Sequence, residues 1–167
     1  MTPDDQRHLT AAEGWLELGD HIAAFDELEN IEPLHRANPE IFKLRWRIYN
    51  KAGQHTAAFA VAEGLTLMLP DEPEPHIWLA HSARRMPDGG SEQALQLLLD
   101  IANDFPDETA VPFDLARYNC QLGRLIEARN WLHIAFEVAE RNGTATFWKS
   151  RTLDEKDLEP LRQEFRL

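Results

Sequence analysis

The feature that most limits the fold of this chain is a seven-residue phrase that returns at a nearly fixed distance. Gly19–Phe25 reads GDHIAAF and Gly53–Phe59 reads GQHTAAF, so five of the seven letters are unchanged. Weaker copies begin at Gly89 and Gly123, which makes the spacings 34, 36 and 34 residues, and each copy keeps alanine at its sixth place. A period of this length is typical of a chain built from stacked copies of one small unit.

Each unit is predicted to be two antiparallel helices joined by a tight turn. Apolar residues recur with helical spacing before each glycine and after each alanine, and strict alternation is absent. Glycine suits the turn because the residue after a helix end often takes the left-handed conformation, which is costly for a residue with a Cβ atom. Alanine suits the sixth place because two helices that cross closely leave no room for a larger side chain.

Proline and capping residues mark where helices begin and end. Thr2-Pro3-Asp4-Asp5 and Asn38-Pro39-Glu40 each read as a cap, a first-turn proline and carboxylates at the positive end of the helix dipole. Pro33 is expected to kink or end the second helix of the first unit. The turn at residues 86–90, Met-Pro-Asp-Gly-Gly, is expected to shorten the first helix of the third unit.

With these features the chain resembles the tetratricopeptide repeat (TPR) family from about Thr2 to Glu140. The second unit matches the family positions best, at Phe42, Tyr49, Gly53, Ala58, Leu65 and Pro70. Arg45 and Trp46 depart from the pattern, because the family usually has a leucine and a small residue there. The resemblance implies an all-α fold, a right-handed superhelical stack of four TPR-like repeats, and the closing segment is similar to bacterial TPR proteins of unassigned role.

We expect a single domain over residues 1–167. Its repeats span about 5–38, 39–72, 75–108 and 109–142, followed by a C-terminal cap at 144–167. In the cap, a last helix beginning near Asp157 carries an apolar stripe of Leu158, Leu161 and Phe165. Such a helix would cover the otherwise exposed face of the fourth repeat, since a stack needs capping at its ends. Trp15, Trp78, Trp131 and Trp148 are expected to make core and cap contacts.

Composition argues against several classes of partner. With 17 basic and 29 acidic residues the formal charge is −12, which argues against nucleic acid or an anionic membrane as the main partner. No apolar run approaches the roughly 20 residues of a membrane span, and the first residues lack the pattern of a signal peptide, so we predict a cytoplasmic location. The single cysteine, Cys120, allows no internal disulfide and is expected to be a packed thiol.

Catalytic motifs are not found in the sequence. It has no phosphate-binding loop, dinucleotide fingerprint, nucleophile elbow or HExxH pair. His21 and His55 occupy the same place in two units and are interpreted as packing residues, whereas His76 and His81 are about 140° apart on a helix, too far for shared coordination. We therefore expect no catalytic residue, no cofactor and no metal.

Positive charge is unevenly distributed. Five of the 17 basic residues, against one acid, fall between residues 36 and 51: Arg36, Lys43, Arg45, Arg47 and Lys51. Lys43, Arg47 and Lys51 are four residues apart, so they form one helical stripe. This stripe faces away from Phe42, Trp46 and Tyr49, which are expected in the core.

The resemblance implies that the first helices of successive repeats line a concave surface. Carrying the family's groove positions across gives a predicted peptide groove of Lys43, Arg47, Asn50, Lys51, His76, Leu79, Ala83, Phe113 and Arg117. Its basic wall and apolar floor would suit an extended or helical segment that bears carboxylates and large apolar side chains. The other interpretation is a solvated basic face that keeps one helix soluble.

Three function classes follow from this sequence. The first is a non-catalytic adaptor or scaffold that binds an acidic or amphipathic segment of a partner protein in its groove. The alternative is a secretion-type TPR chaperone that shields apolar client segments, for which Leu79, Ala83 and Phe113 would form the floor. A small enzyme or metal protein is the remote alternative. The oligomeric state stays open between monomer and dimer.

Overall fold

The computed structural model describes residues 1–162, and this range is helical without a strand, so the all-α prediction is confirmed. Its helices gather in two compact units, residues 1–86 and the residues from 87 onward. The division falls inside the predicted third repeat at 75–108, between its two helices. The expectation of a single domain stays a prediction. Within residues 1–162, no helix has the length and apolar character that crossing a membrane requires.

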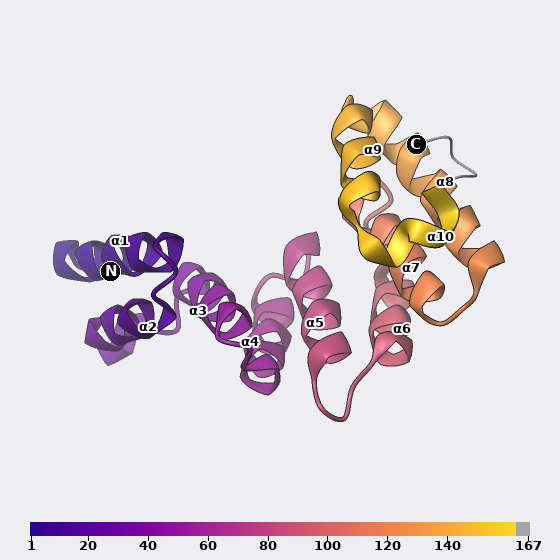
Figure 1. Ribbon diagram of the computed structural model, residues 1–167. Helices are drawn as coiled ribbons and strands as arrows, with labels where there is room; N and C mark the ends of the chain where they lie inside the picture. Colours follow the sequence, from indigo (N-terminus) through magenta and orange to yellow (C-terminus); the bar gives the residue numbers. More distant parts are fainter. Residues whose placement is uncertain (163–167) are drawn as a thin grey trace. The chain divides into compact units, whose positions relative to one another are not determined.

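The first unit consists of successive helices that pack against their neighbours along the chain (Figure 1). Its elements are α1 (Pro3–Glu17), α2 (His21–Asn30), the 3-10 turn η1 (Pro33–His35), α3 (Pro39–Lys51), α4 (His55–Met68) and α5 (Pro73–Arg85). The pairs α1 with α2 and α3 with α4 correspond to the first two of the four helix–turn–helix repeats that the sequence predicts. Helix α5 packs on α4.

The turn glycines behave as predicted in three of the four copies. Gly19, Gly53 and Gly123 have φ values of +87°, +71° and +73°. The prediction is wrong for the third copy, where Gly90 rather than Gly89 takes a positive φ, of +150°. The physical reason is the longer turn, in which α5 ends well before Gly89 and Gly90 directly precedes the next helix.

The predicted helix starts and stops are also present. Thr2 caps α1 through a reciprocal pair of hydrogen bonds with Asp5, and the Asn38 side chain accepts a hydrogen bond from the backbone of Glu40 at the start of α3. Helix α2 ends at Asn30, and Pro33 opens the separate turn η1. Because proline cannot donate a backbone hydrogen bond, it ends the regular helix ahead of it.

The core of the first unit depends on an unusual tryptophan. Trp46, where the family has a small residue, is buried and stacks on Trp78 of α5 with ring centroids 4.4 Å apart and planes 5° apart. Its indole Nε1 donates a hydrogen bond of 3.0 Å to the buried hydroxyl of Ser82. The two rings therefore bridge α3 and α5. Trp15 departs from its prediction as a core residue, since it is 41% exposed.

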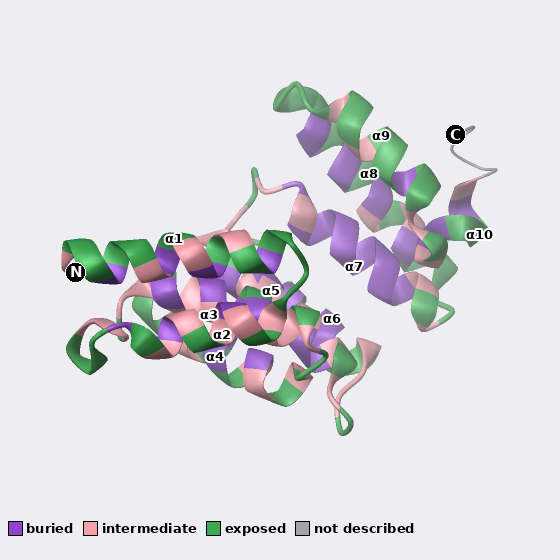
Figure 2. Ribbon diagram, turned by 60° about the vertical axis from the view of Figure 1, so that its left-hand side comes forward, coloured by how far each residue is buried: buried purple, intermediate pink, exposed green. Residues whose placement is uncertain are grey.

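The second unit is built around one buried helix, α7 (Ala110–Gln121). Its elements are α6 (Ser91–Ile101), α7 (Ala110–Gln121), α8 (Leu125–Arg141), α9 (Ala145–Asp154), the 3-10 turn η2 (Lys156–Leu158) and α10 (Glu159–Arg162). Helix α7 is buried from Val111 to Asn119 (Figure 2). It packs on α6, α8 and η2.

The C-terminal cap is built differently from its prediction. The region of the predicted cap begins with helix α9, at Ala145–Asp154, ahead of the one expected last helix. The last helix does not begin as an α-helix near Asp157, because η2 comes first and α10 follows. Leu158 and Leu161 of the predicted stripe are buried in the core of the second unit, as expected. Phe165 lies outside the described residues.

Candidate peptide-binding surface

Three of the predicted groove residues meet on α3, at a hollow next to α1. The hollow has a volume of about 240 Å³ and is lined by Leu16, Glu17, Trp46, Arg47, Asn50 and Lys51. The Asn50 side chain accepts a hydrogen bond of 2.9 Å from Arg85, which brings the end of α5 to the same place. We call Arg47, Lys51 and Arg85, with Asn50 between them, the basic edge.

Within residues 1–162, no carboxylate forms an ion pair with the cations of the basic edge. Arg47, Lys51 and Arg85 are exposed. Among residues 1–162, Arg47 and Lys51 form no ion pair, and the partner of Arg85 is the neutral amide of Asn50. Glu17 is the one acid in the lining of the hollow. Three cations are therefore available to an incoming carboxylate in a chain that is acidic overall.

Lys43 belongs to the predicted stripe but is already engaged. Its Nζ lies 3.0 Å from a Glu72 oxygen and 3.2 Å from a Glu40 oxygen. The hydrogen bond to Glu72 raises the pKa of Lys43, with a further contribution from Glu40. The stripe is thus divided. The charge of Lys43 is neutralised, whereas Arg47 and Lys51 have no ion-pair partner among residues 1–162.

Helix α5 contributes less of the predicted groove than expected. Leu79 is partly buried against the cluster around Trp46, and Ala83 is fully buried and adds no open apolar surface. His76 lies at the start of α5, where Nε2 is 3.2 Å from the Pro70 carbonyl oxygen. Arg85 was missed from the sequence because no groove position was carried across to it.

Phe113 and Arg117, the groove residues predicted in the fourth repeat, lie in the interior of the second unit. Phe113 is 1% exposed, and its ring centroid is 4.8 Å from that of Trp148 on α9. Arg117 has an 8% exposed side chain and contacts Asp114, Glu155 and Asp157 at 2.7, 3.1 and 3.2 Å. The cap covers both side chains, so we leave them out of the candidate surface.

One group among residues 1–162 has the atoms and spacing of a metal site: Asp5, Glu32 and His35 have ligand atoms within 4.8 Å of one another. The Asp5 carboxylate already accepts hydrogen bonds from the backbone of Thr2 and Glu32 and pairs with His35 Nδ1 at 2.7 Å. The backbone donors of Glu32 and Thr2 hold the pKa of Asp5 well below its usual range. These contacts fasten the segment after α2 to the start of α1, which is a structural role.

Cys120 of α7 is partly buried against the core of the second unit, in agreement with the expected packed thiol. Burial raises the pKa of this thiol to about 11, and nearby Asp157 contributes in the same direction. A thiol with this pKa is a poor nucleophile at neutral pH, because the reactive species is the thiolate.

Comparison with known proteins supports the fold. The chain is similar to the crystal structure of TTC0263, a thermophilic TPR protein in Thermus thermophilus, with a TM-score of 0.66 and 19% sequence identity over 97% of each chain. At this identity the likeness concerns the fold, and it confirms the predicted stack of TPR-like helical repeats. No family model and no curated protein matches the sequence.

Proposed function

We propose that this chain is a non-catalytic scaffold that binds a carboxylate-bearing segment of a partner protein at the basic edge. The observation that carries the proposal is the pair of exposed cations Arg47 and Lys51, which have no ion-pair partner among residues 1–162 and line a hollow with the apolar side chains of Leu16 and Trp46. A carboxylate would contact the cations, and a neighbouring apolar side chain would enter the hollow.

Charge and shape have separate parts in this proposal. Opposite charge speeds encounter and fixes the orientation of the ligand, while burial of an apolar anchor slows dissociation. The indole of Trp46 is fixed by its stack on Trp78 and its bond to Ser82, so the wall of the hollow is ordered before binding. An ordered wall lowers the entropic cost of binding.

The chaperone alternative is not favoured by the observed side chains. It relied on an open apolar floor of Leu79, Ala83 and Phe113, and the last two are buried. We therefore propose the scaffold function and not the chaperone function.

The test is affinity capture from a lysate of the source cells with three forms of the full chain. They are the wild type, Arg47→Glu/Lys51→Glu, and the control Arg7→Glu/Arg141→Glu, which makes the same change in charge at two other exposed positions. We expect the wild type and the control to recover the same protein, and the first variant to bind it at least about tenfold more weakly. Moderate salt should weaken the wild-type interaction.

Identical recovery by all three forms would show that the basic edge is only a solvated surface. The same conclusion would follow if the captured protein were retained by Arg47→Glu/Lys51→Glu at every salt concentration. Folding of each variant is checked by its circular dichroism spectrum, so that a loss of binding is not confused with a loss of structure.

A further inference from the structure

Helix α3 has a second face that the proposed function does not use. Phe42, Arg45, Tyr49 and Ala52 follow one another at helical spacing, and Arg45 is about 200° around the helix from Arg47. These residues line two hollows between α2 and α4, of about 590 and 350 Å³, and Tyr49 belongs to both. We call the two hollows together the α3 groove. From Phe42 to Ala52 it is about 15 Å long.

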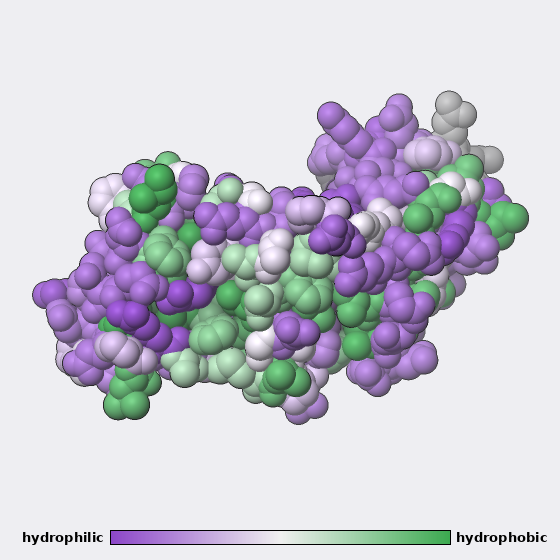
Figure 3. Space-filling view, turned by 90° about the horizontal axis from the view of Figure 1, so that it is seen from below, coloured by the Kyte–Doolittle hydropathy of each residue, from purple (hydrophilic) through white to green (hydrophobic). Residues whose placement is uncertain are grey.

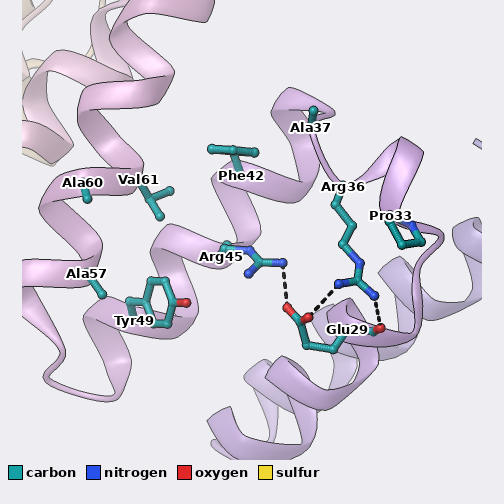
Figure 4. A pocket seen from close by; sticks show the side chains of 10 residues that line it. All are labelled: Glu29, Pro33, Arg36, Ala37, Phe42, Arg45, Tyr49, Ala57, Ala60 and Val61. Carbon is teal, nitrogen blue, oxygen red and sulfur yellow. Dashed lines mark hydrogen bonds and ion pairs between the residues drawn. The ribbon is translucent and has the colours of Figure 1, made fainter.

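Small side chains make the larger hollow. Helix α4 presents Ala57 and Ala60 to it, and Ala37 lines it from the segment before α3. Weakly apolar surface covers this part of the first unit in Figure 3. The leucine that the repeat pattern would place at position 45 is replaced by Arg45, which points to Glu29 rather than filling the space (Figure 4). The hollow therefore has room for a large side chain from another molecule.

At one end of the α3 groove, two arginines contact a single carboxylate. The Glu29 carboxylate contacts Arg36 at 2.8 Å and Arg45 at 2.9 Å, so two guanidinium groups share one carboxylate. Arg36 also donates to the backbone oxygens of Glu29 and Ile31, which uses most of its donors.

Arg45 has donors to spare. Its side chain is 18% exposed, and Glu29 is its one ion-pair partner among residues 1–162. Its guanidinium carbon lies 5.6 Å from the centre of the Phe25 ring, which holds the group in place beside the hollow. A guanidinium has five N–H donors and can bind a second carboxylate.

We propose that the α3 groove docks a protein segment that places a Leu, Phe or Trp side chain against Ala57 and Ala60 and an adjacent carboxylate on Arg45. The alanines provide the space, and the excess positive charge at Arg45 selects an acidic neighbour. Because this groove lies on the other side of α3 from the basic edge, the inference goes beyond the proposed function. The scaffold can hold two segments at once.

The test is a selection from a display library of random 12-residue peptides. The immobilised protein is full-length Arg47→Glu/Lys51→Glu, so that peptides recruited by the basic edge are removed. Selected peptides are then measured on the same protein with Ala60→Trp added, which fills the hollow from an exposed position. Glu63→Trp is the matched control, since residue 63 is exposed on α4 and does not line the groove.

We expect selected sequences to pair Asp or Glu with Leu, Phe or Trp, and to lose at least about tenfold in affinity with Ala60→Trp but not with Glu63→Trp. Changing the acid of a selected peptide to its amide should cost about tenfold. Failure to enrich any sequence, or equal binding to the Ala60→Trp protein, would overturn the inference. Peptides selected by the wild type and not by Arg47→Glu/Lys51→Glu would support binding at the basic edge. They would contradict binding at the α3 groove.

Discussion

Arg47 and Arg117 occupy the same place in the second and fourth copies of the repeat, 70 residues apart, and their surroundings are opposite. Arg47 is exposed, and no carboxylate of residues 1–162 pairs with it. Arg117 is buried among Asp114, Glu155 and Asp157. The repeat therefore determines where along its helix each arginine lies, but the chain that follows determines whether it is open to a partner. In the second unit the cap takes the place that a ligand would need.

Removal of Arg117 should destabilise the chain far more than removal of Arg47. Arg117→Met leaves three carboxylates without their shared cation, and we expect the free energy of unfolding to fall by about 3–5 kcal/mol. Arg47→Met removes an exposed group with no partner in the described chain, and the change should stay within about 0.5 kcal/mol. Urea denaturation followed by circular dichroism measures both. Similar losses for the two variants would contradict the difference in burial between Arg47 and Arg117.

Two buried hydroxyls allow a smaller test of how each unit is packed. Ser82 and Thr152 each donate to the carbonyl oxygen four residues earlier, Trp78 and Trp148, at 2.8 Å. Ser82 in addition accepts the indole N–H of Trp46. Ser82→Ala leaves that buried donor unpaired and should cost about 1–3 kcal/mol, whereas Thr152→Val should cost about 1 kcal/mol.

The same denaturation measurement compares these two variants. An equal or larger loss for Thr152→Val would mean that the stacked tryptophans do not depend on Ser82. The first unit would then lack the fixed wall that the basic edge requires.

Lowering the pH should destabilise the start of the first unit, because Asp5 becomes protonated. Because the folded pKa of Asp5 is lowered by backbone donors, its stabilising contribution is complete above the unfolded pKa of about 4 and is lost as the pH falls below it. The thermal midpoint of the wild type should exceed that of Asp5→Asn at pH 7, and the gap should close toward pH 2. Circular dichroism melts across this range check it, and a gap that does not change with pH would contradict the assignment.

A further prediction concerns the reactivity of Cys120 rather than the stability of the chain. Burial raises the pKa of Cys120 from 9.0 to about 11, so at pH 8 its thiolate fraction should be about a hundredfold below that of an unperturbed thiol. The reaction of the folded chain with an aromatic disulfide reagent should be slower by about this factor than the reaction in denaturant. Equal rates would mean that the interior of the second unit is open to solvent.

Much of the fold was predictable from the sequence because its signals are local. The glycines, alanines and prolines act within one turn of their own positions, and they indicate the helix pairs, the end of α2 and the start of α3. The cap was predicted in part, since Leu158 and Leu161 form an apolar stripe that is in fact buried. Helix α9 was missed because its sequence lacks a clear helical stripe of apolar residues.

The candidate site was less predictable because it depends on partners distant in the sequence. Nothing near Arg117 indicates that Glu155 and Asp157 will neutralise it, about 40 residues later. Lys43 is likewise neutralised by Glu72 from another helix. Arg47, Asn50 and Lys51 lie around one hollow, and their place in a peptide groove stays a prediction. Their role in binding stays a proposal.

Arginine modification measures the central contrast most directly. The folded full-length chain is treated with phenylglyoxal, and the modified positions are followed over time by mass spectrometry. We predict that Arg47 reacts readily and that Arg117 reacts at least about tenfold more slowly until denaturant is added, because its guanidinium is buried under the cap. Equal rates at the two arginines in the folded chain would contradict the account.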